Sequence, residues 1–192
     1  HASILATLDA LYGSKDVVGR HLVISGLGQV GGRLAKRLAA EGATLTVTDV
    51  NMGKKDLAES IGASWVEVPT AHTIDADLFV PCGLGGVLTS PVIEELAVRG
   101  VVGAANNQLA DHSGAGQLAA RGILWAPDFV VNGGGVIFLD MATQPGADAA
   151  AIAARVTQIG DVVAKIFRDS VDKEITTLEA AEQLAAARLD AA

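Results

Sequence analysis

The feature that most constrains this chain is a short apolar run, residues 21–25, that leads into Gly-Leu-Gly-Gln-Val-Gly-Gly, ending at Gly32. A run that is apolar on both faces is typical of a central parallel strand. In a GxGxxG turn, Gly26 permits the tight turn, Gly28 lets the backbone approach a pyrophosphate, and Gly31 lets the next helix pack close to the strand. The free N–H groups and positive dipole end of that helix would face the phosphates. The stretch therefore predicts a dinucleotide-binding turn.

An acidic residue follows at the spacing that such a turn requires. The next expected strand, residues 44–48, ends at Asp49, about twenty residues after the glycines. A carboxylate there can accept hydrogen bonds from the adenosine ribose and repels a 2′-phosphate, which favours NAD over NADP. The alternative is that Asp49 only caps a turn. Lys54 and Lys55 could contact a 2′-phosphate, although a solvated helix face suits them better.

Apolar periodicity and glycine or proline stops divide the rest of the chain into alternating strands and helices. The expected strands are residues 21–25, 44–48, 65–68, 77–80, 101–104 and 123–126. The expected helices are residues 2–13, 29–41, 52–61, 91–99 with Gly100 as the stop, 114–121, 147–168 and 176–189, the last with a capping box at Thr176 and Glu179. This alternation predicts an α/β fold of Rossmann type: a doubly wound, mostly parallel sheet with helices on both faces and a helical C-terminal extension.

Polar and glycine-rich segments follow two of the later strands. Residues 81–86, which contain Cys82, follow strand 77–80, and ligands of doubly wound sheets lie beyond such strand ends. No base is placed to activate Cys82, so its thiol is better explained as a small packing group. Asn106 and Asn107 follow the next strand, where uncharged amides suit a carboxamide or a polar substrate group. An Asx turn is the alternative.

A third such segment begins at Asn132, which precedes three glycines and an apolar helix start. This pattern suggests a helix N-terminus that faces a ligand, and a flexible loop is the alternative. The neighbouring residues Asp111, His112 and Ser113 cannot form a catalytic triad in that order without a sharp fold. No His, Cys or carboxylate cluster has metal-ligand spacing, so no metal is expected.

Composition narrows the class of protein. The 192 residues suffice for one sizeable α/β domain. A net charge of −8 argues against nucleic acid as a partner, and the chain has no apolar run long enough to span a membrane. The single cysteine excludes an internal disulfide and fits a cytoplasmic location.

Taken together, the motifs GLGQVGG, TDVN, FVPCGLGG, GAANNQL and WAPDFVVNGGGVI resemble the cofactor-binding half of the amino-acid dehydrogenases, chiefly the leucine, valine and phenylalanine enzymes. The resemblance extends from about Gly19 to Leu189, with the motifs in the family's order. It implies NAD-dependent, reversible oxidative deamination of an L-amino acid to a 2-oxo acid and ammonia. An apolar side chain is expected on the substrate.

The resemblance also assigns residues, position by position. Those expected around NAD are Gly26, Leu27, Gly28, Gln29, Val30, Gly31 and Gly32 at the pyrophosphate; Asp49 and Val50 at the ribose; Cys82, Gly83 and Leu84 on the adenosine–nicotinamide ribose side; and Ala105, Asn106, Asn107 and Asn132 near the nicotinamide. Asn107, Val136 and Leu139 are expected to contact the substrate. The family usually has alanine where this chain has Gly83 and Gly133, and the loss of a methyl should loosen the backbone locally.

The family's catalytic lysines and aspartate lie in an N-terminal substrate domain that nothing here matches, so no catalytic residue is assigned. We expect residues 1–18 to form a linking helix at the end of that absent domain, residues 19–146 the NAD-binding domain, and residues 147–192 helices that pack on it. Such a chain should bind NAD and catalyse little, and the full-length protein should be a homo-oligomer. Two alternatives remain: a free-standing NAD-binding module, and a biosynthetic relative that acts on an aromatic amino acid.

Overall fold

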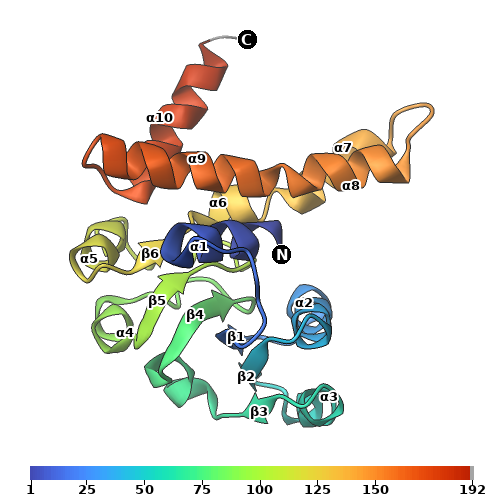
Figure 1. The fold of residues 1–192 in the computed structure, drawn as a ribbon, viewed down its shortest axis with the longest axis vertical. Coiled ribbons are helices and arrows are strands. Elements are labelled where there is room, and N and C mark those ends of the chain that lie inside the picture. Colours follow the sequence, from blue (N-terminus) through green and yellow to red (C-terminus); the bar gives the residue numbers. More distant parts are fainter. Residues whose placement is uncertain (191–192) are drawn as a thin grey trace.

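The computed structural model describes residues 1–190 and contains one six-stranded sheet (Figure 1). Its strands are β1 (His21–Ser25), β2 (Thr44–Thr48), β3 (Ser64–Trp65), β4 (Ala76–Pro81), β5 (Val98–Val101) and β6 (Leu124–Trp125). The strand order is β3-β2-β1-β4-β5-β6, and every neighbouring pair is parallel. This order and orientation define a Rossmann fold, which confirms the predicted fold class.

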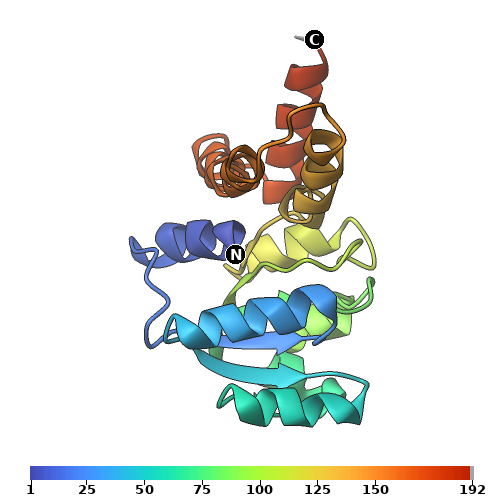
Figure 2. The same cartoon turned by 90° about the vertical axis from the view of Figure 1, so that its right-hand side faces the viewer.

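Helices flank the sheet and continue beyond it at the C-terminal end of the chain (Figures 1 and 2). The α-helices are α1 (Ala2–Tyr12), α2 (Gln29–Ala40), α3 (Lys55–Ser60), α4 (Ser90–Glu95), α5 (Gly114–Ala120), α6 (Asp128–Val131), α7 (Gly134–Ala142), α8 (Ala149–Thr157), α9 (Ile159–Asp172) and α10 (Thr177–Leu189). Two short 3-10 helices, η1 (Met52–Lys54) and η2 (Val68–Thr73), precede α3 and β4. None of the helices within residues 1–190 is long and apolar enough to cross a membrane.

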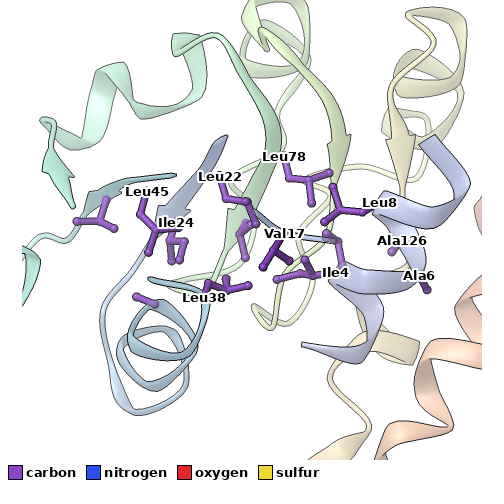
Figure 3. Close-up of a cluster of buried hydrophobic side chains, with 14 of the residues drawn as sticks. Ile4, Ala6, Leu8, Val17, Leu22, Ile24, Leu38, Leu45, Leu78 and Ala126 are labelled. Atoms are coloured by element: carbon purple, nitrogen blue, oxygen red, sulfur yellow. The ribbon is translucent and has the colours of Figure 1, made fainter. Parts of the chain in front are cut away.

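Alternate residues of the central strands enter two separate apolar cores. Leu22 and Ile24 pack with side chains of α1, α2 and α9 (Figure 3). Val23, between them, points to the other face and packs with side chains of η2, α4 and α5. This alternation follows from the two-residue repeat of a strand. Both faces of β1 are therefore buried, as expected of the central strand of a doubly wound sheet.

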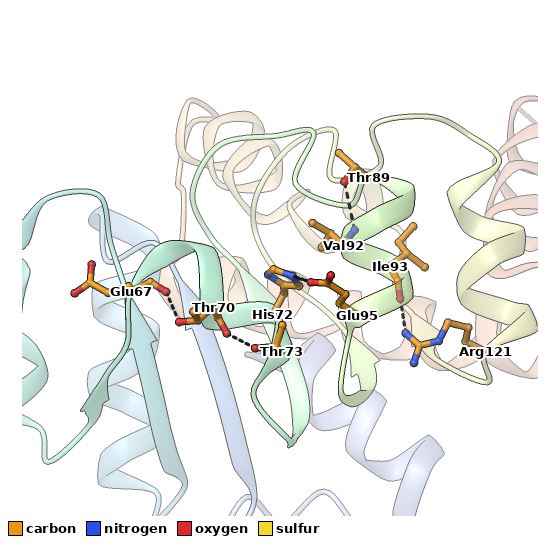
Figure 4. A network of polar contacts seen from close by, with 9 residues as sticks. All are labelled: Glu67, Thr70, His72, Thr73, Thr89, Val92, Ile93, Glu95 and Arg121. Carbon is orange, nitrogen blue, oxygen red and sulfur yellow. Dashed lines mark hydrogen bonds and ion pairs between the residues drawn. The ribbon is translucent and has the colours of Figure 1, made fainter.

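Side-chain hydrogen bonds tie together the helices of the second face (Figure 4). His72 Nε2 of η2 lies 3.0 Å from Glu95 Oε2 of α4. Thr89 caps the start of α4 by accepting a hydrogen bond from the backbone N–H of Val92, and the Arg121 guanidinium donates to the carbonyl of Ile93. These contacts connect η2, α4 and the end of α5 on one side of the sheet.

A polar cluster attaches the end of α1 to the amino ends of β1 and β4. The Asp77 carboxylate accepts hydrogen bonds from the backbone N–H of His21 at 2.8 Å and from Arg20 Nη1 at 3.4 Å. The Arg20 guanidinium also lies 3.7 Å from the centre of the Tyr12 ring. Burial, together with the neighbouring Asp77 carboxylate, raises the pKa of Tyr12 to about 12. This cluster lies at the amino ends of the strands, whereas the predicted cofactor site lies at their carboxyl ends.

The prediction of a helix over residues 91–99 was too long, and the strand after it begins earlier than residue 101. Helix α4 ends at Glu95, and β5 occupies Val98–Val101 with Gly100 inside the strand. A Cβ atom at Gly100 would lie 2.9 Å from a methyl of Leu78 and 3.1 Å from the carbonyl of Leu124. Gly100 therefore allows close strand packing, and it is not a helix stop.

Two other boundaries differ from the predictions. Strand β3 has only two residues, because Pro69 lies in the first turn of η2 and the predicted strand over residues 65–68 stops at Trp65. The predicted helix over residues 147–168 is two helices that meet at Gln158. Gln158 keeps right-handed helical dihedrals, so the apolar stripe continues through the break and the sequence pattern does not reveal it. The capping box at Thr176 and Glu179 is confirmed.

Candidate functional site

Four of the predicted site segments lie together at the carboxyl ends of neighbouring strands. The glycine turn follows β1, Asp49 follows β2, Cys82 follows β4, and the Asn106–Asn107 pair lies beyond β5. Strands β1 and β4 are neighbours in the sheet although β2 and β3 come between them in the chain. Doubly wound sheets bind ligands at this kind of switch point, in the crevice outside the carboxyl ends.

The glycine turn has a tightly packed part and an open part. Gly26 has φ +103°, and a Cβ there would lie 2.6 Å from the backbone nitrogen of Gly83. A Cβ at Gly31 would lie 2.0 Å from the carbonyl oxygen of Gly26, so α2 packs directly against the turn. A Cβ at Gly28 would have no atom within 4 Å. Packing within the protein thus requires glycine at positions 26 and 31, whereas Gly28 faces open space.

Asp49 is bonded to the glycine turn. Its Oδ2 accepts a hydrogen bond from the backbone N–H of Leu27 at 2.6 Å, and its Oδ1 accepts one from the N–H of Asn51 at 2.8 Å. Asp49 therefore does cap a turn, as the alternative interpretation held, and it also joins the ends of β1 and β2. The N–H of Leu27 is used in this contact and is not free for a phosphate. The N–H groups of the first turn of α2, which starts at Gln29, have no partner within the helix.

Three apolar side chains are exposed around this turn. Val30, Val50 and Leu84 expose 59%, 84% and 83% of their surface. They come from the segments after β1, β2 and β4, so they surround the same crevice. Leu27 and Ala105, by contrast, are 1% and 3% exposed, so either could meet a cofactor only through its backbone.

Cys82 has the surroundings of a packing residue. Its backbone N–H donates to the carbonyl of Ser25 at 2.7 Å, and its Cβ would be 2.9 Å from a Cβ placed at Gly31. Burial raises the pKa of its thiol, which disfavours the nucleophilic thiolate.

The three predicted asparagines converge from different segments. The side-chain amide of Asn132, at the end of α6, donates to the side-chain oxygen of Asn106. Asn107 has a left-handed backbone, φ +51°, and its N–H donates to Asp128 Oδ2 at 2.8 Å. The loop after β5 and the α6–α7 junction therefore form one polar surface.

Three residues that the sequence analysis did not assign hold this surface in place. Asp128, which is 7% exposed, is the acceptor for Asn107. The fully buried Gln108 donates through Nε2 to the carbonyls of Gly103 and Ala105, at 2.7 and 3.1 Å, and accepts from Trp125 Nε1 at 3.1 Å. These contacts fix the backbone of the loop. No sequence motif signals the contacts of Asp128 and Trp125, because each joins residues that are far apart in the chain.

A cavity of about 420 Å³ adjoins the asparagines. Its walls include Val30 of α2, Gly103 after β5, Asn106, Asn132 and Gly134 at the start of α7. Val136 and Leu139 are not among its lining residues. They lie three residues apart on α7 and expose 72% and 64% of their surface. Their contact with a substrate stays a prediction.

The residues around His112 form a local turn. Asp111 accepts a hydrogen bond from the backbone N–H of Ser113, which makes a local turn. Among residues 1–190, no group of three His, Cys, Asp or Glu side chains could hold a metal ion.

Comparison with known proteins gives consistent matches. The sequence profile described as Glutamate/Leucine/Phenylalanine/Valine dehydrogenase matches residues 48–192. A phenylalanine dehydrogenase from Bacillus thermotolerans is 36% identical over 97% of this chain and 50% of its own length. A leucine dehydrogenase from Bacillus cereus is 36% identical over 93% of this chain and 49% of its own length.

Solved structures agree with these matches. The crystal structure of L-tryptophan dehydrogenase from Nostoc punctiforme superposes with a TM-score of 0.94 at 34% identity, over 98% of this chain and 56% of that one. A glutamate dehydrogenase from Thermus thermophilus shares the fold, with a TM-score of 0.72 at 22% identity. The chain thus spans about half the length of the relatives it matches. On the profile match and these similarities, the chain belongs to the Glutamate/Leucine/Phenylalanine/Valine dehydrogenase family.

Proposed function

We propose that this chain is the NAD-binding half of a dehydrogenase that converts an apolar L-amino acid reversibly to a 2-oxo acid and ammonia. Membership of a dehydrogenase family implies a nicotinamide cofactor. The relatives named above that are 34–36% identical to this chain are phenylalanine, leucine and tryptophan dehydrogenases, which favours an apolar substrate for this protein also.

The observation that carries the proposal is the Asp49 carboxylate, bonded to the N–H of Leu27 beside the glycine turn at the switch point. The surroundings fit a dinucleotide. The open face of Gly28 and the first turn of α2 would take the diphosphate. Asp49 keeps free lone pairs for the ribose hydroxyls, and Val50 and Leu84 offer apolar surface to the bases.

The remaining site residues would orient the reacting end. The bound nicotinamide supplies the hydride acceptor. Asn106, Asn107 and Asn132 have amide donors and acceptors that suit its carboxamide or a polar group of the substrate. The 420 Å³ cavity beside them has the size of a small-molecule site. No proton-transfer group is assigned within residues 1–190. In this proposal, these groups would come from another part of the intact protein.

Titration calorimetry of the 192-residue chain with NAD and with NADH tests cofactor binding. The critical variant is Gly28→Val. A Cβ atom at this position meets no protein atom within 4 Å, so the variant should keep the fold while its side chain occupies the space of the diphosphate. We expect at least about a tenfold loss of affinity, equivalent to about 1.4 kcal/mol.

Gly116→Val in α5 is the matched control, because a Cβ there is equally free of contacts and lies far along the chain from the glycine turn. Absence of NAD binding to the folded chain, or equal affinity in the Gly28 variant, would refute the proposal. The substrate class is tested separately, by following NADH formation by the intact protein with phenylalanine, leucine, tryptophan, valine and glutamate. Activity with glutamate alone would contradict an apolar substrate.

A further inference from the structure

A cavity of about 640 Å³ lies away from the cofactor crevice, along the edge strand β6. Its walls come from α1, α5, β6 and α9, with one residue of α10, and Figure 1 shows these elements gathered in the left half of the molecule. None of its lining residues is among those predicted to contact the cofactor or the substrate. The volume is that of a small-molecule site, so the cavity is a candidate for a second ligand.

The inner wall of this cavity is apolar and well packed. Leu118 of α5, Trp125 of β6 and Phe167 of α9 line it, and each of these side chains is otherwise buried in one of the two apolar cores. The indole N–H of Trp125 is already bonded to Gln108, so it is not available to a ligand. A molecule with an apolar body would therefore gain most by covering this wall, because it removes apolar surface from water.

Helices α1 and α9 both end at this cavity. They run in the same direction, because Gly160 at the start of α9 meets Ala2 at the start of α1, and residues near the end of each helix line the cavity. Within residues 1–190, no backbone N–H donates to the carbonyls of Ala10 and Leu11, in the last turn of α1. The negative ends of two helix dipoles therefore meet here, which favours a positively charged group.

The charged side chains at the rim have the same preference. The charged lining residues are Asp9 of α1 and Arg168 and Asp172 of α9. All three are exposed, and among the described residues none of them takes part in an ion pair. Two carboxylates and one guanidinium make the rim net negative. An ammonium group would thus be attracted by both carboxylates, and a carboxylate on the same ligand could pair with Arg168.

We propose that this cavity binds an apolar small molecule that carries an ammonium group, either an apolar amino acid or an apolar amine. The ammonium group would bind beside Asp9 and Asp172 at the helix ends, and the apolar body would cover the wall that contains Leu118 and Phe167. The proposal does not rest on the proposed function, because the cavity shares no residue with the cofactor crevice.

Fluorescence titration of the 192-residue chain tests this site, in a Trp65→Phe background that leaves Trp125 in the cavity wall as the only tryptophan. The probes are L-phenylalanine, 2-phenylethylamine, which lacks the carboxylate, and 3-phenylpropionate, which lacks the ammonium group. We expect a saturable change of emission with the first two, and at least about tenfold weaker binding of 3-phenylpropionate.

The first two probes also distinguish the two kinds of ligand. Tighter binding of phenylalanine, with the preference lost in Arg168→Gln, would identify an amino acid as the ligand, because only phenylalanine has a carboxylate to pair with Arg168. Equal or tighter binding of 2-phenylethylamine would identify an amine. Either result supports the proposal.

Variants at the wall and at the rim locate the binding. Ala119→Phe should block the cavity and weaken binding at least about tenfold, because Ala119 is exposed and lines it. Ala120→Phe is the matched control, since Ala120 is also exposed at the end of α5 but does not line the cavity, and it should stay within about twofold. Asp9→Asn/Asp172→Asn should weaken binding of both ammonium probes at least about fivefold, and Asp140→Asn should not.

Three results would each overturn the proposal: no saturable change with either ammonium probe, equal affinity for 3-phenylpropionate, or unchanged affinity in the Ala119 variant. None of these titrations contains NAD, so their outcome is separate from that of the cofactor-binding test.

Discussion

Asp49 is the residue on which most of the site geometry depends, because it bonds two backbone N–H groups while its carboxylate remains at the end of β2. We predict that Asp49→Ala weakens NAD binding about tenfold or more, since a hydrogen bond to a charged group contributes about 1.5–3 kcal/mol. It should also narrow the preference for NAD over NADP. Calorimetry with both cofactors measures the two effects. Asp75→Ala, at the opposite end of the sheet, should alter neither, and unchanged NAD affinity in the Asp49 variant would count against the ribose contact.

Asp128 also holds a loop by accepting a hydrogen bond from a backbone N–H, on the asparagine side of the crevice. Its buried carboxylate accepts a hydrogen bond from the backbone N–H of Asn107, which has a left-handed backbone. We predict that Asp128→Ala lowers the free energy of unfolding by about 1–3 kcal/mol, because it leaves a polar group without its partner. Asp128→Asn keeps an acceptor oxygen and should recover most of the loss. Urea unfolding at neutral pH measures both variants, with the exposed Asp140→Ala as the control. Equal stability of the alanine and asparagine variants would show that the acceptor is irrelevant.

These residues also show which parts of the site are predictable from the sequence. Gly26, Gly31 and the carboxylate of Asp49 are predictable because the turn and the spacing between two adjacent strands are local in the chain. The bond between Asn107 and Asp128 joins residues 21 positions apart, and that between Gln108 and Trp125 joins residues 17 apart. Nothing in one sequence pairs them, since the pairing arises only when β5 and β6 lie side by side.

At the scale of elements, predictions succeed where a pattern has one physical cause. The alternation of apolar runs and helices predicts the sheet because strands β1, β2 and β4 are buried on both faces. A glycine in the sequence can mean either helix termination or close packing. The sequence pattern therefore predicts a helix stop at Gly100, although this residue lies within β5 against Leu78. Gln158 ends α8 without leaving helical dihedrals, so no stop signal is present there.

The attachment of α1 to the sheet should make stability depend on pH through Asp77. Burial raises the pKa of this carboxyl, but hydrogen bonds from Tyr12, the N–H of His21 and Arg20 outweigh it and hold the pKa below its usual range. A carboxyl whose pKa is lower in the folded state contributes stability above its unfolded value of about 3.9, and this stability is lost as the pH falls through the folded value.

We therefore predict that Asp77→Asn lowers the free energy of unfolding by about 1 kcal/mol at neutral pH. The difference from the unmodified chain should shrink toward zero as the pH falls through the lowered pKa of the native carboxyl, because that carboxyl then also becomes protonated. Urea unfolding at a series of pH values measures this. A difference that does not change with pH would mean that the charge of Asp77 contributes nothing and that only its shape matters.

At the scale of the whole molecule, one apolar core joins α1 and α9 to the sheet. It contains Ile4 and Leu8 of α1, the central strand residues Leu22 and Ile24, and Phe167 of α9. The sequence predicts α1 as a linking helix and the C-terminal helices as a layer packed on the NAD-binding domain. That division stays a prediction, and the shared core favours cooperative unfolding of α1, α9 and the sheet.

The contact between α1 and α9 allows this to be tested at one position. Gly160 lies where the two helices approach, and a Cβ there would be 2.9 Å from the carbonyl oxygen of Ala2. Gly160→Val should force the helices apart and lower the free energy of unfolding by about 1–3 kcal/mol, with Gly116→Val as the control.

Two probes report on different parts of the molecule. Far-UV circular dichroism reports largely on the helices, and tryptophan fluorescence reports on Trp65 and Trp125 in the two edge strands, β3 and β6. Both transitions should shift together to lower denaturant, because the terminal helices and the sheet share their buried surface. A shift of the dichroism transition alone would show instead that α1 and α9 form a unit that unfolds separately from the sheet.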